Sequence, residues 1–254
     1  MVTFDFTNKT AIVTGSGSGI GFSIAKSFLS CGANVVLCGR KEEKLNEAKN
    51  KLQDLIKDNH DKILVVRCDM SSEESVSELV LKTTDFFSNL DIFINNSGAF
   101  LSKPILNITD HDIIQIFSNN LKSTILGTKY GALSMKRGGV IINVGSFAGV
   151  MAMKNASLYS CVKSGVANFT KSAASELAKL NIRVNCIIPG VIRTPMTSKY
   201  IDDNYEELIK PIPLGRIGDV EDIANCVLFL SSELAGYITG ACLEITGGKY
   251  STQL

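Results

Sequence analysis

The chain has 254 residues, of which 45% are apolar and 20% are charged. This composition excludes a disordered or low-complexity chain, because enough apolar side chain is present to build a large core. The net charge of +1 predicts no general attraction to nucleic acid or to an anionic membrane. Because no apolar run reaches about 18 residues and no basic leader opens the chain, we expect a cytoplasmic protein without a membrane anchor.

The cysteines and histidines argue against a metal site. Seven cysteines occur without a Cys-x-x-Cys pair, and the chain has only two histidines. Structural zinc sites need such ligands at close spacing, so we expect no bound metal. Several cysteines lie in apolar runs, where a thiol packs as a small hydrophobic group, and this favours a reducing compartment. If the protein is an enzyme, its acid and base must come mostly from side chains other than histidine.

Short runs of Val, Ile and Leu alternate along the chain with longer segments of helical periodicity. Because these runs are continuous, they predict strands that are buried on both faces of a parallel sheet. The expected strands span residues 10–13, 34–38, 62–66, 91–94, 139–144, 182–188 and 241–245. The first three expected helices have apolar faces at residues 20–28, 45–56 and 76–87, and three more are expected over about 110–135, 158–180 and 219–230.

This alternation predicts a single-domain α/β Rossmann fold over residues 1–254. Its sheet is expected to be parallel, seven-stranded and doubly wound, with helices on both faces. Ser71 and Glu74 predict a capping box before the third helix, and Asp219 predicts the cap of the last one. The segment 194–217 contains three prolines, and a connection of this length predicts a loop that covers a substrate.

A glycine-rich turn, Thr-Gly-Ser-Gly-Ser-Gly-Ile-Gly, follows the first expected strand at residues 14–21. The usual Gly-x-Gly-x-x-Gly spacing is absent, but Gly15, Gly19 and Gly21 can serve the same purpose. Glycines at such a turn let a pyrophosphate approach the N–H groups of a helix N-terminus, so the turn predicts a dinucleotide site. A glycine-rich turn without a ligand is the alternative interpretation.

Arg40 stands at the end of the second expected strand, where a fold that binds NAD usually has an acid. No carboxylate occurs there before Glu42. Because arginine can donate two hydrogen bonds to the 2′-phosphate of NADP(H), we expect NADP(H), with NAD(H) as the alternative. A solvated arginine at the start of an exposed helix is the other interpretation.

The third motif combines Ser146, at the carboxyl end of an expected strand, with Tyr159 and Lys163 on an expected helix. Residues four apart share one helix face, which places the phenol beside the ammonium. An adjacent ammonium favours the phenolate, so Tyr159 could act as an acid or base near neutral pH. Taken alone, a Tyr-x-x-x-Lys pair is more often a chance pairing on a helix.

Together these motifs resemble the short-chain dehydrogenase/reductase family, over residues 9–248. Further matching features are Asp69 after the third expected strand, Asn95-Asn96-Ser97-Gly98 after the fourth, Asn120-Leu121 on the long helix, and residues 189–194. Two positions depart from the family pattern. Ser97 replaces the usual alanine, and Ser18 stands where NADP-dependent members often have a basic residue.

The resemblance implies four catalytic residues. Tyr159 would exchange a proton with the substrate oxygen, and Ser146 would orient that oxygen. Lys163 would lower the pKa of Tyr159 and bind the nicotinamide ribose. Asn120, chosen over the adjacent Asn119, would hold a proton-relay water through an irregularity of its helix.

The resemblance also implies the residues around the cofactor. Asp69 would reach the adenine amino group, and Ile192 and Thr194 would hold the nicotinamide carboxamide. The complete set of expected cofactor-binding residues is Gly15, Ser16, Ser18, Gly19, Ile20, Arg40, Asp69, Met70, Asn96, Ser97, Gly98, Tyr159, Lys163, Pro189, Gly190, Ile192 and Thr194.

These expectations favour an oxidoreductase that moves hydride between NADP(H) and a small-molecule secondary alcohol or ketone. A catalytically silent dinucleotide sensor or scaffold is one alternative, and another Rossmann enzyme, such as a methyltransferase, is a second. Apolar residues in the loop over 195–215 favour a hydrophobic ketone, and 3-oxoacyl thioesters, steroids and sugar-derived ketones all remain open. The resemblance implies a homotetramer, packed through the long helices that carry Asn120 and Tyr159.

Overall fold

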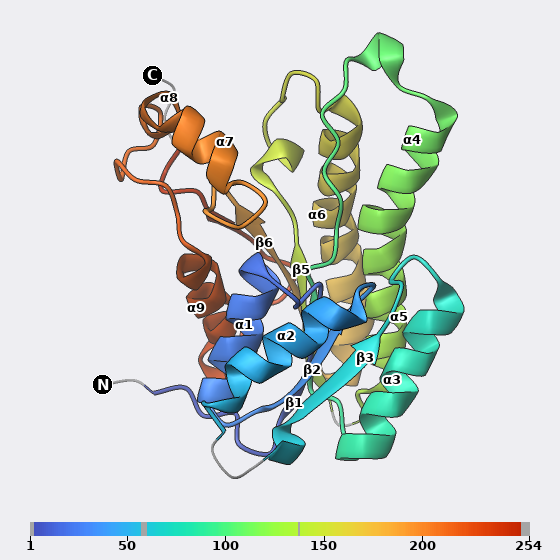
Figure 1. Cartoon of the computed structure of the whole chain (residues 1–254). Helices are drawn as coiled ribbons and strands as arrows, with labels where there is room; N and C mark the ends of the chain where they lie inside the picture. The colour runs from blue at the N-terminus through green and yellow to red at the C-terminus, as the bar shows by residue number, and fades with distance from the viewer. Residues whose placement is uncertain (1–2, 57–59, 137, 250–254) are drawn as a thin grey trace.

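One parallel sheet organises the chain in the computed structural model, which describes residues 3–56, 60–136 and 138–249 (Figure 1). Its seven strands lie in the order β3-β2-β1-β4-β5-β6-β7, and every neighbouring pair is parallel. The strands are β1 (Thr10–Thr14), β2 (Asn34–Gly39), β3 (Ile63–Arg67), β4 (Ile92–Asn95), β5 (Gly139–Val144), β6 (Ile182–Pro189) and β7 (Cys242–Ile245). The predicted doubly wound α/β fold is confirmed, and each strand end lies within one residue of its prediction.

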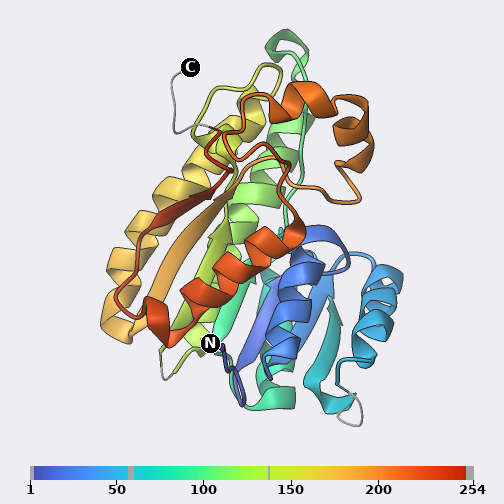
Figure 2. The ribbon, with the colours of Figure 1, turned by 90° about the vertical axis from the view of Figure 1, so that its left-hand side faces the viewer.

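Helices cover both faces of the sheet. The first face carries α1 (Gly19–Ser30), α2 (Glu42–Gln53) and α9 (Val220–Ser231). In Figure 2, α1 and α9 stand in front of the sheet and α2 stands at its right-hand edge. The second face carries α3 (Glu73–Phe87), α5 (Ser123–Ser134) and α6 (Ser157–Leu177). Shorter helices are α4 (Asp110–Ile116), α7 (Ser198–Asp203) and α8 (Tyr205–Ile209), with 3₁₀ turns at His60–Lys62, Ile105–Asn107, Phe147–Gly149, Ala178–Leu180 and Glu233–Ala235.

The two faces have separate hydrophobic cores because successive strand residues point to opposite sides. Along β4, Phe93 packs beneath α5, whereas Ile94 packs into the core that contains α1 and α9. Two small clusters lie outside both cores: one contains Val166, Cys186 and Ile188, and the other contains Ile201, Ile212 and Ile217, in the segment after β6. That segment therefore has a hydrophobic centre of its own.

Three predicted segments need more detail. The helix predicted over 110–135 has the irregularity that the resemblance implied at Asn120, since a π-helical turn at Phe117–Lys122 joins α4 to α5. The second helix, predicted from apolar positions within residues 45–56, spans Glu42–Gln53, and Glu42 and Glu43 suit the positive N-terminal end of a helix. The inserted loop predicted over 194–217 contains α7 and α8.

The predicted cap of α3 is wrong. Ser72, and not Ser71, is the N-cap, and its hydroxyl accepts a hydrogen bond from the Ser75 N–H at 3.3 Å. Ser71 is engaged elsewhere, since its backbone N–H and its hydroxyl both donate to Asp69, at 3.0 and 2.8 Å. An aspartate turn thus competes with the cap that the sequence pattern suggested. Asp219 does precede α9, as predicted, and its N–H donates to the Asp222 carboxylate at 2.8 Å.

Three general properties of the described residues bear on function. None of their helices is long and apolar enough to cross a membrane. No group of three or more His, Cys, Asp or Glu side chains among them is placed to hold a metal ion. All seven cysteines lie within the described ranges and are free thiols.

Candidate active site

The turns after β1 and β4 are bonded to each other. The Thr14 hydroxyl accepts hydrogen bonds from the backbone N–H groups of Asn96 and Ser97, both at 2.8 Å. The Asn96 side-chain amide donates to the Thr14 carbonyl at the same distance. These bonds place two of the predicted motifs, the glycine turn and the Asn-Asn-Ser-Gly segment, at one point on the carboxyl edge of the sheet.

Glycine is required at each of the three predicted positions, for its backbone conformation at two of them and for space at the third. Gly15 and Gly19 have φ values of +66° and +60°, in the left-handed region that glycine adopts most easily. Gly21 is required for space, because a Cβ atom there would lie 2.5 Å from both the Gly15 carbonyl oxygen and the Asn96 Nδ2. The turn can therefore pack against Asn96 only because Gly15 and Gly21 have no side chains.

The start of α1 fits the phosphate end of a dinucleotide. Ser18 is the N-cap of this helix, and its side chain makes no capping hydrogen bond in the described structure. The first N–H groups of α1, together with the helix dipole, therefore suit an anion. Ser16 is fully buried, and its hydroxyl accepts a hydrogen bond from the Cys38 N–H at 3.0 Å, so this side chain holds the turn in place.

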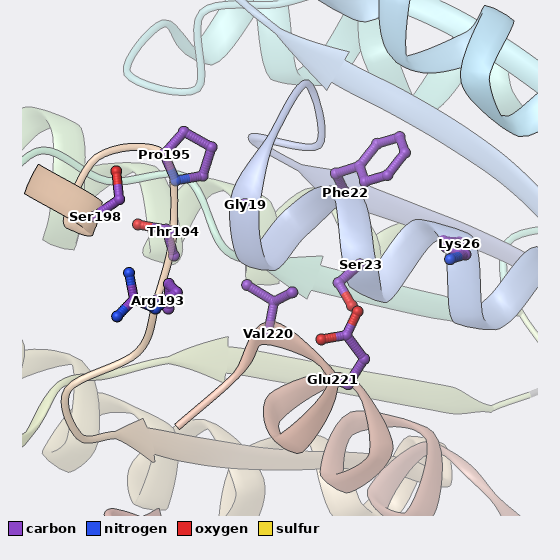
Figure 3. Close-up of a pocket in the computed structure, with 10 residues that line it drawn as sticks. All are labelled: Gly19, Phe22, Ser23, Lys26, Arg193, Thr194, Pro195, Ser198, Val220 and Glu221. Atoms are coloured by element: carbon purple, nitrogen blue, oxygen red, sulfur yellow. The ribbon is translucent and has the colours of Figure 1, made fainter. Parts of the chain in front are cut away.

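The segment after β6 faces this helix start. A Cβ atom on Gly19 would lie 3.5 Å from the Thr194 Cβ. The close-up in Figure 3 labels both residues. The Gly190 N–H donates to the Ile245 carbonyl at 2.9 Å, and Ile192 is buried. Thr194 thus lies against the start of α1, whereas Gly190 lies beside the end of β7.

Between these elements lies a cavity of about 440 Å³ (Figure 3). It is lined by Gly19, Phe22, Ser23, Lys26, Arg193, Thr194, Pro195, Ser198, Val220 and Glu221. The segment that closes it is held by Thr197, whose hydroxyl donates to the Ile192 carbonyl at 2.7 Å and accepts from the Thr194 N–H at 2.9 Å. Thr197 was not predicted, and its position seven residues after Gly190 carries no recognisable motif.

Arg40 and Asp69 lie near each other at the ends of β2 and β3. Partial burial raises the pKa of the Asp69 carboxyl, but the two hydrogen bonds from Ser71 and the charges of Arg40 and Lys122 outweigh it. The pKa of Asp69 is therefore lower than usual. Arg40 itself is exposed, and Met70, the next predicted cofactor residue, is buried.

Lys163 joins α6 to β5 beneath the predicted catalytic residues. Its side chain is buried, and its Nζ donates a hydrogen bond to the Val144 carbonyl at 2.9 Å. The same Nζ lies 5.7 Å from the centre of the Tyr159 ring. Ser146 follows two residues after Val144, and its hydroxyl accepts a hydrogen bond from the Ala148 N–H at 3.2 Å. The structure thus gathers the three residues of the predicted motif around the end of β5.

Asn120 lies within the π-helical turn and is fully buried. Its side-chain amide donates to the Ala99 carbonyl at 2.9 Å and accepts from the Ala99 N–H at 3.3 Å. Gly98 completes the group, since a Cβ atom there would lie 2.7 Å from the Asn120 Oδ1 and 3.6 Å from the Lys163 Nζ. The adjacent Asn119 instead donates to the Gln115 carbonyl on its own helix.

Phe100 is a site residue that sequence reasoning missed. Its ring meets the Tyr159 ring edge to face, with centroids 5.1 Å apart and an interplanar angle of 82°. A phenylalanine two residues after the Asn-Asn-Ser-Gly segment has no spacing that points to Tyr159, so only the folded chain reveals the contact.

Comparison with known proteins agrees with this geometry. A family model described as enoyl-(acyl carrier protein) reductase matches residues 15–249. The 3-oxoacyl-(acyl-carrier-protein) reductase FabG of Chlamydia muridarum is 36% identical over 243 residues, which cover 95% of this chain and 97% of that protein. The crystal structure of a Brucella melitensis protein, titled short-chain dehydrogenase/reductase SDR: glucose/ribitol dehydrogenase, has a TM-score of 0.93 and 29% identity, over 98% of this chain and 99% of that one.

The chain belongs to the short-chain dehydrogenase/reductase family. It is therefore an oxidoreductase of a family that uses NAD(P)(H) and acts on hydroxyl and keto groups. Another similar short-chain dehydrogenase/reductase structure is titled 7α-hydroxysteroid dehydrogenase complexed with NADH and 7-oxo glycochenodeoxycholic acid. Its TM-score is 0.91 at 31% identity, over 96% of this chain and 95% of that one.

Substitution of Gly21 by alanine should destabilise the fold. The new methyl group would press on the Gly15 carbonyl and on Asn96, and overpacking of this kind costs about 1–3 kcal/mol. Urea unfolding without dinucleotide measures the loss. Gly39→Ala is the matched control, because its Cβ atom would meet only the Leu45 Cδ2, at an ordinary 3.6 Å. Equal stability of the two variants would contradict the steric argument.

Proposed function

We propose that this short-chain dehydrogenase/reductase transfers hydride between NADP(H) and a secondary alcohol or ketone, with Tyr159 as acid and base. One observation carries the proposal: the buried Lys163 lies between the Tyr159 ring and the end of β5, where Ser146 begins the next turn. A dinucleotide sensor would need the glycine turn but would have no use for this grouping.

Each residue then has a chemical task. When bound, the dinucleotide supplies or accepts the hydride. The Tyr159 hydroxyl gives a proton to the substrate oxygen during reduction and takes it back during oxidation. The Lys163 ammonium favours the phenolate form of Tyr159, and the Ser146 hydroxyl orients the substrate oxygen by a hydrogen bond. Asn120, in its π-helical turn, holds the water that passes the proton onward.

The cofactor is expected to contact the remaining predicted residues. The pyrophosphate would lie over Gly15, Ser18, Gly19 and Ile20, whose backbone leads into the uncapped start of α1. Asp69 would meet the adenine, and Thr194 with Ile192 would hold the nicotinamide end. The segment 194–217, with α7 and α8, would cover the substrate.

For the substrate we favour a hydrophobic ketone. Two of the similar proteins are named for 3-oxoacyl and steroid substrates, which carry an apolar chain or ring system beside the reacting carbonyl, whereas the Brucella melitensis protein is named for glucose and ribitol. In this chain Met196 and Tyr200, in the covering segment, have largely exposed side chains that could line such a substrate.

The free thiols support a reducing, cytoplasmic location.

Tyr159→Phe should lower kcat about 10²- to 10⁴-fold in either direction, because only the phenol oxygen can exchange the proton. Dinucleotide affinity should fall far less than kcat, because Tyr159 is only one of the many predicted cofactor contacts. Stopped-flow and steady-state assays measure the rate, and calorimetry measures the affinity. Tyr130→Phe serves as the control, since that hydroxyl bonds Glu73 outside the site. Wild-type turnover in Tyr159→Phe would refute Tyr159 as the acid and base, whereas a wild-type protein without turnover would favour the catalytically silent scaffold.

Arg40→Ala should weaken NADPH binding about 10- to 100-fold and leave NADH binding unchanged, because charged hydrogen bonds to the 2′-phosphate would be lost. Arg40→Lys should recover only part of the NADPH affinity, since an ammonium lacks the two-pronged geometry. Lys51→Ala, at the far end of α2, controls for the loss of a nearby charge. Equal loss for both dinucleotides, or tighter NADH binding by the wild type, would refute the NADP(H) assignment.

We also propose that the protein forms a homotetramer through α5 and α6. Apolar side chains such as Ile125 and Leu133 are exposed on α5, and Leu180 is exposed just beyond α6. A groove of about 730 Å³ runs between the same two helices. Helices with such faces bury them by packing against another helix.

Sedimentation velocity should therefore give four times the chain mass of 27.4 kDa. Leu133→Glu should produce smaller species, because a buried, unpaired charge disfavours an interface. Leu81→Glu, an equally exposed leucine on α3, should leave the assembly intact. A monomeric wild-type protein would contradict the proposal.

A further inference from the structure

We propose that Phe100 is the specificity-determining residue of this site and selects flat, bulky, apolar ketones over small, polar ones. The inference rests on the oxidoreductase function proposed above, and it identifies the side chain against which the substrate body would lie. The residue comes from the segment between β4 and α4, outside every motif that the sequence analysis used.

The first support is the position of the ring. Phe100 meets Tyr159 edge to face, at 5.1 Å between centroids, yet 48% of its side chain remains exposed. One part of the ring therefore packs on the proposed proton donor, and the rest faces outward beside it. A substrate whose oxygen reaches the Tyr159 hydroxyl would bring its neighbouring carbons against this exposed apolar surface.

The second support is that Phe100 is held in place. The Asn120 side chain binds both the N–H and the carbonyl of Ala99, the residue immediately before it. Three residues further on, the Lys103 N–H donates to the Asn155 carbonyl at 2.6 Å. A residue whose backbone is anchored on both sides, and whose ring already packs on Tyr159, loses little further freedom when a substrate binds, which favours its use in recognition.

The third support is the apolar character of the adjoining loop. The bond from Lys103 to Asn155 sets the Phe100 segment beside the loop between β5 and α6, and Figure 1 shows the two running together above the sheet. That loop exposes three large apolar side chains, Val150, Met151 and Met153, next to the polar Lys154 and Asn155. The three apolar side chains offer a polyhydroxylated ketone no hydrogen-bond partners, whereas an apolar ring system would gain buried area on them.

The test compares two ketones in the reductive direction, trans-1-decalone as the bulky apolar substrate and hydroxyacetone as the small polar one. In Phe100→Ala, the ratio of kcat/KM for decalone over hydroxyacetone should fall at least about tenfold, because the contact area of a phenylalanine ring is lost. The loss should appear mainly in KM for decalone. Phe100→Leu, which keeps part of the apolar surface, should show a smaller fall.

Phe86→Ala is the matched control. Phe86 is 51% exposed and also meets an aromatic neighbour, Phe87, edge to face at 82°, but it lies on α3. This variant should keep the wild-type ratio. An unchanged ratio in Phe100→Ala would overturn the proposal. So would an equal loss for both ketones, because Phe100 would then only hold Tyr159 in position.

A binding measurement separates this proposal from the proposed reaction. Decalone is titrated by calorimetry into Tyr159→Phe protein saturated with reduced dinucleotide, with and without the additional Phe100→Ala change. A decalone affinity that falls at least about tenfold in the double variant would support the recognition role even if turnover is absent. No detectable decalone binding, or binding that does not depend on Phe100, would overturn it. The proposed reaction has its own test, because wild-type turnover in Tyr159→Phe would refute it whatever the decalone affinity.

Discussion

The arrangement of the candidate site depends on the hydrogen bond from the buried Lys163 to the Val144 carbonyl. An amino group without a partner would be costly at this depth, so the bond fixes where α6 crosses the end of β5. Tyr159 stands one helical turn before Lys163, and Ser146 stands two residues after Val144. A single contact therefore sets the phenol, the ammonium and the serine relative to one another, and Gly98 leaves room for Asn120 to approach the same ammonium.

The fold could be predicted because its signals are local and repeated. Continuous apolar runs such as residues 139–144 indicate strands with both faces covered, and the alternation with helices leaves few other topologies. Predictions failed where two local interactions competed. Ser71 matched the capping pattern, but its hydroxyl donates a hydrogen bond to Asp69, and Ser72 is the N-cap instead. The π-helical turn also has no sequence period of its own, and only the resemblance suggested an irregularity there.

The site was predictable where residue type dictates the chemistry, as at Gly15, Gly19 and the pair of Tyr159 with Lys163. It was not predictable where contacts span the chain. The Thr14 hydroxyl serves a turn more than 80 residues away, and Asn120 reaches back 21 residues to Ala99. Ser16, expected at the cofactor, has its hydroxyl turned inward to the Cys38 N–H. The position of Phe100 at the site follows only from its ring contact with Tyr159 in the folded chain.

The two sides of the site are built in different ways, and this has a consequence for how such enzymes diversify. The Phe100 segment is tied to the buried Asn120, so changing it also disturbs the group around Lys163. The segment after β6 has stabilising contacts of its own, at Thr197 and in the separate cluster of Ile201, Ile212 and Ile217, besides the bond from the Leu214 N–H to the Gly247 carbonyl. Under the proposed function, exchange of this segment between relatives would change the cover of the substrate and leave the contacts of Lys163 unchanged.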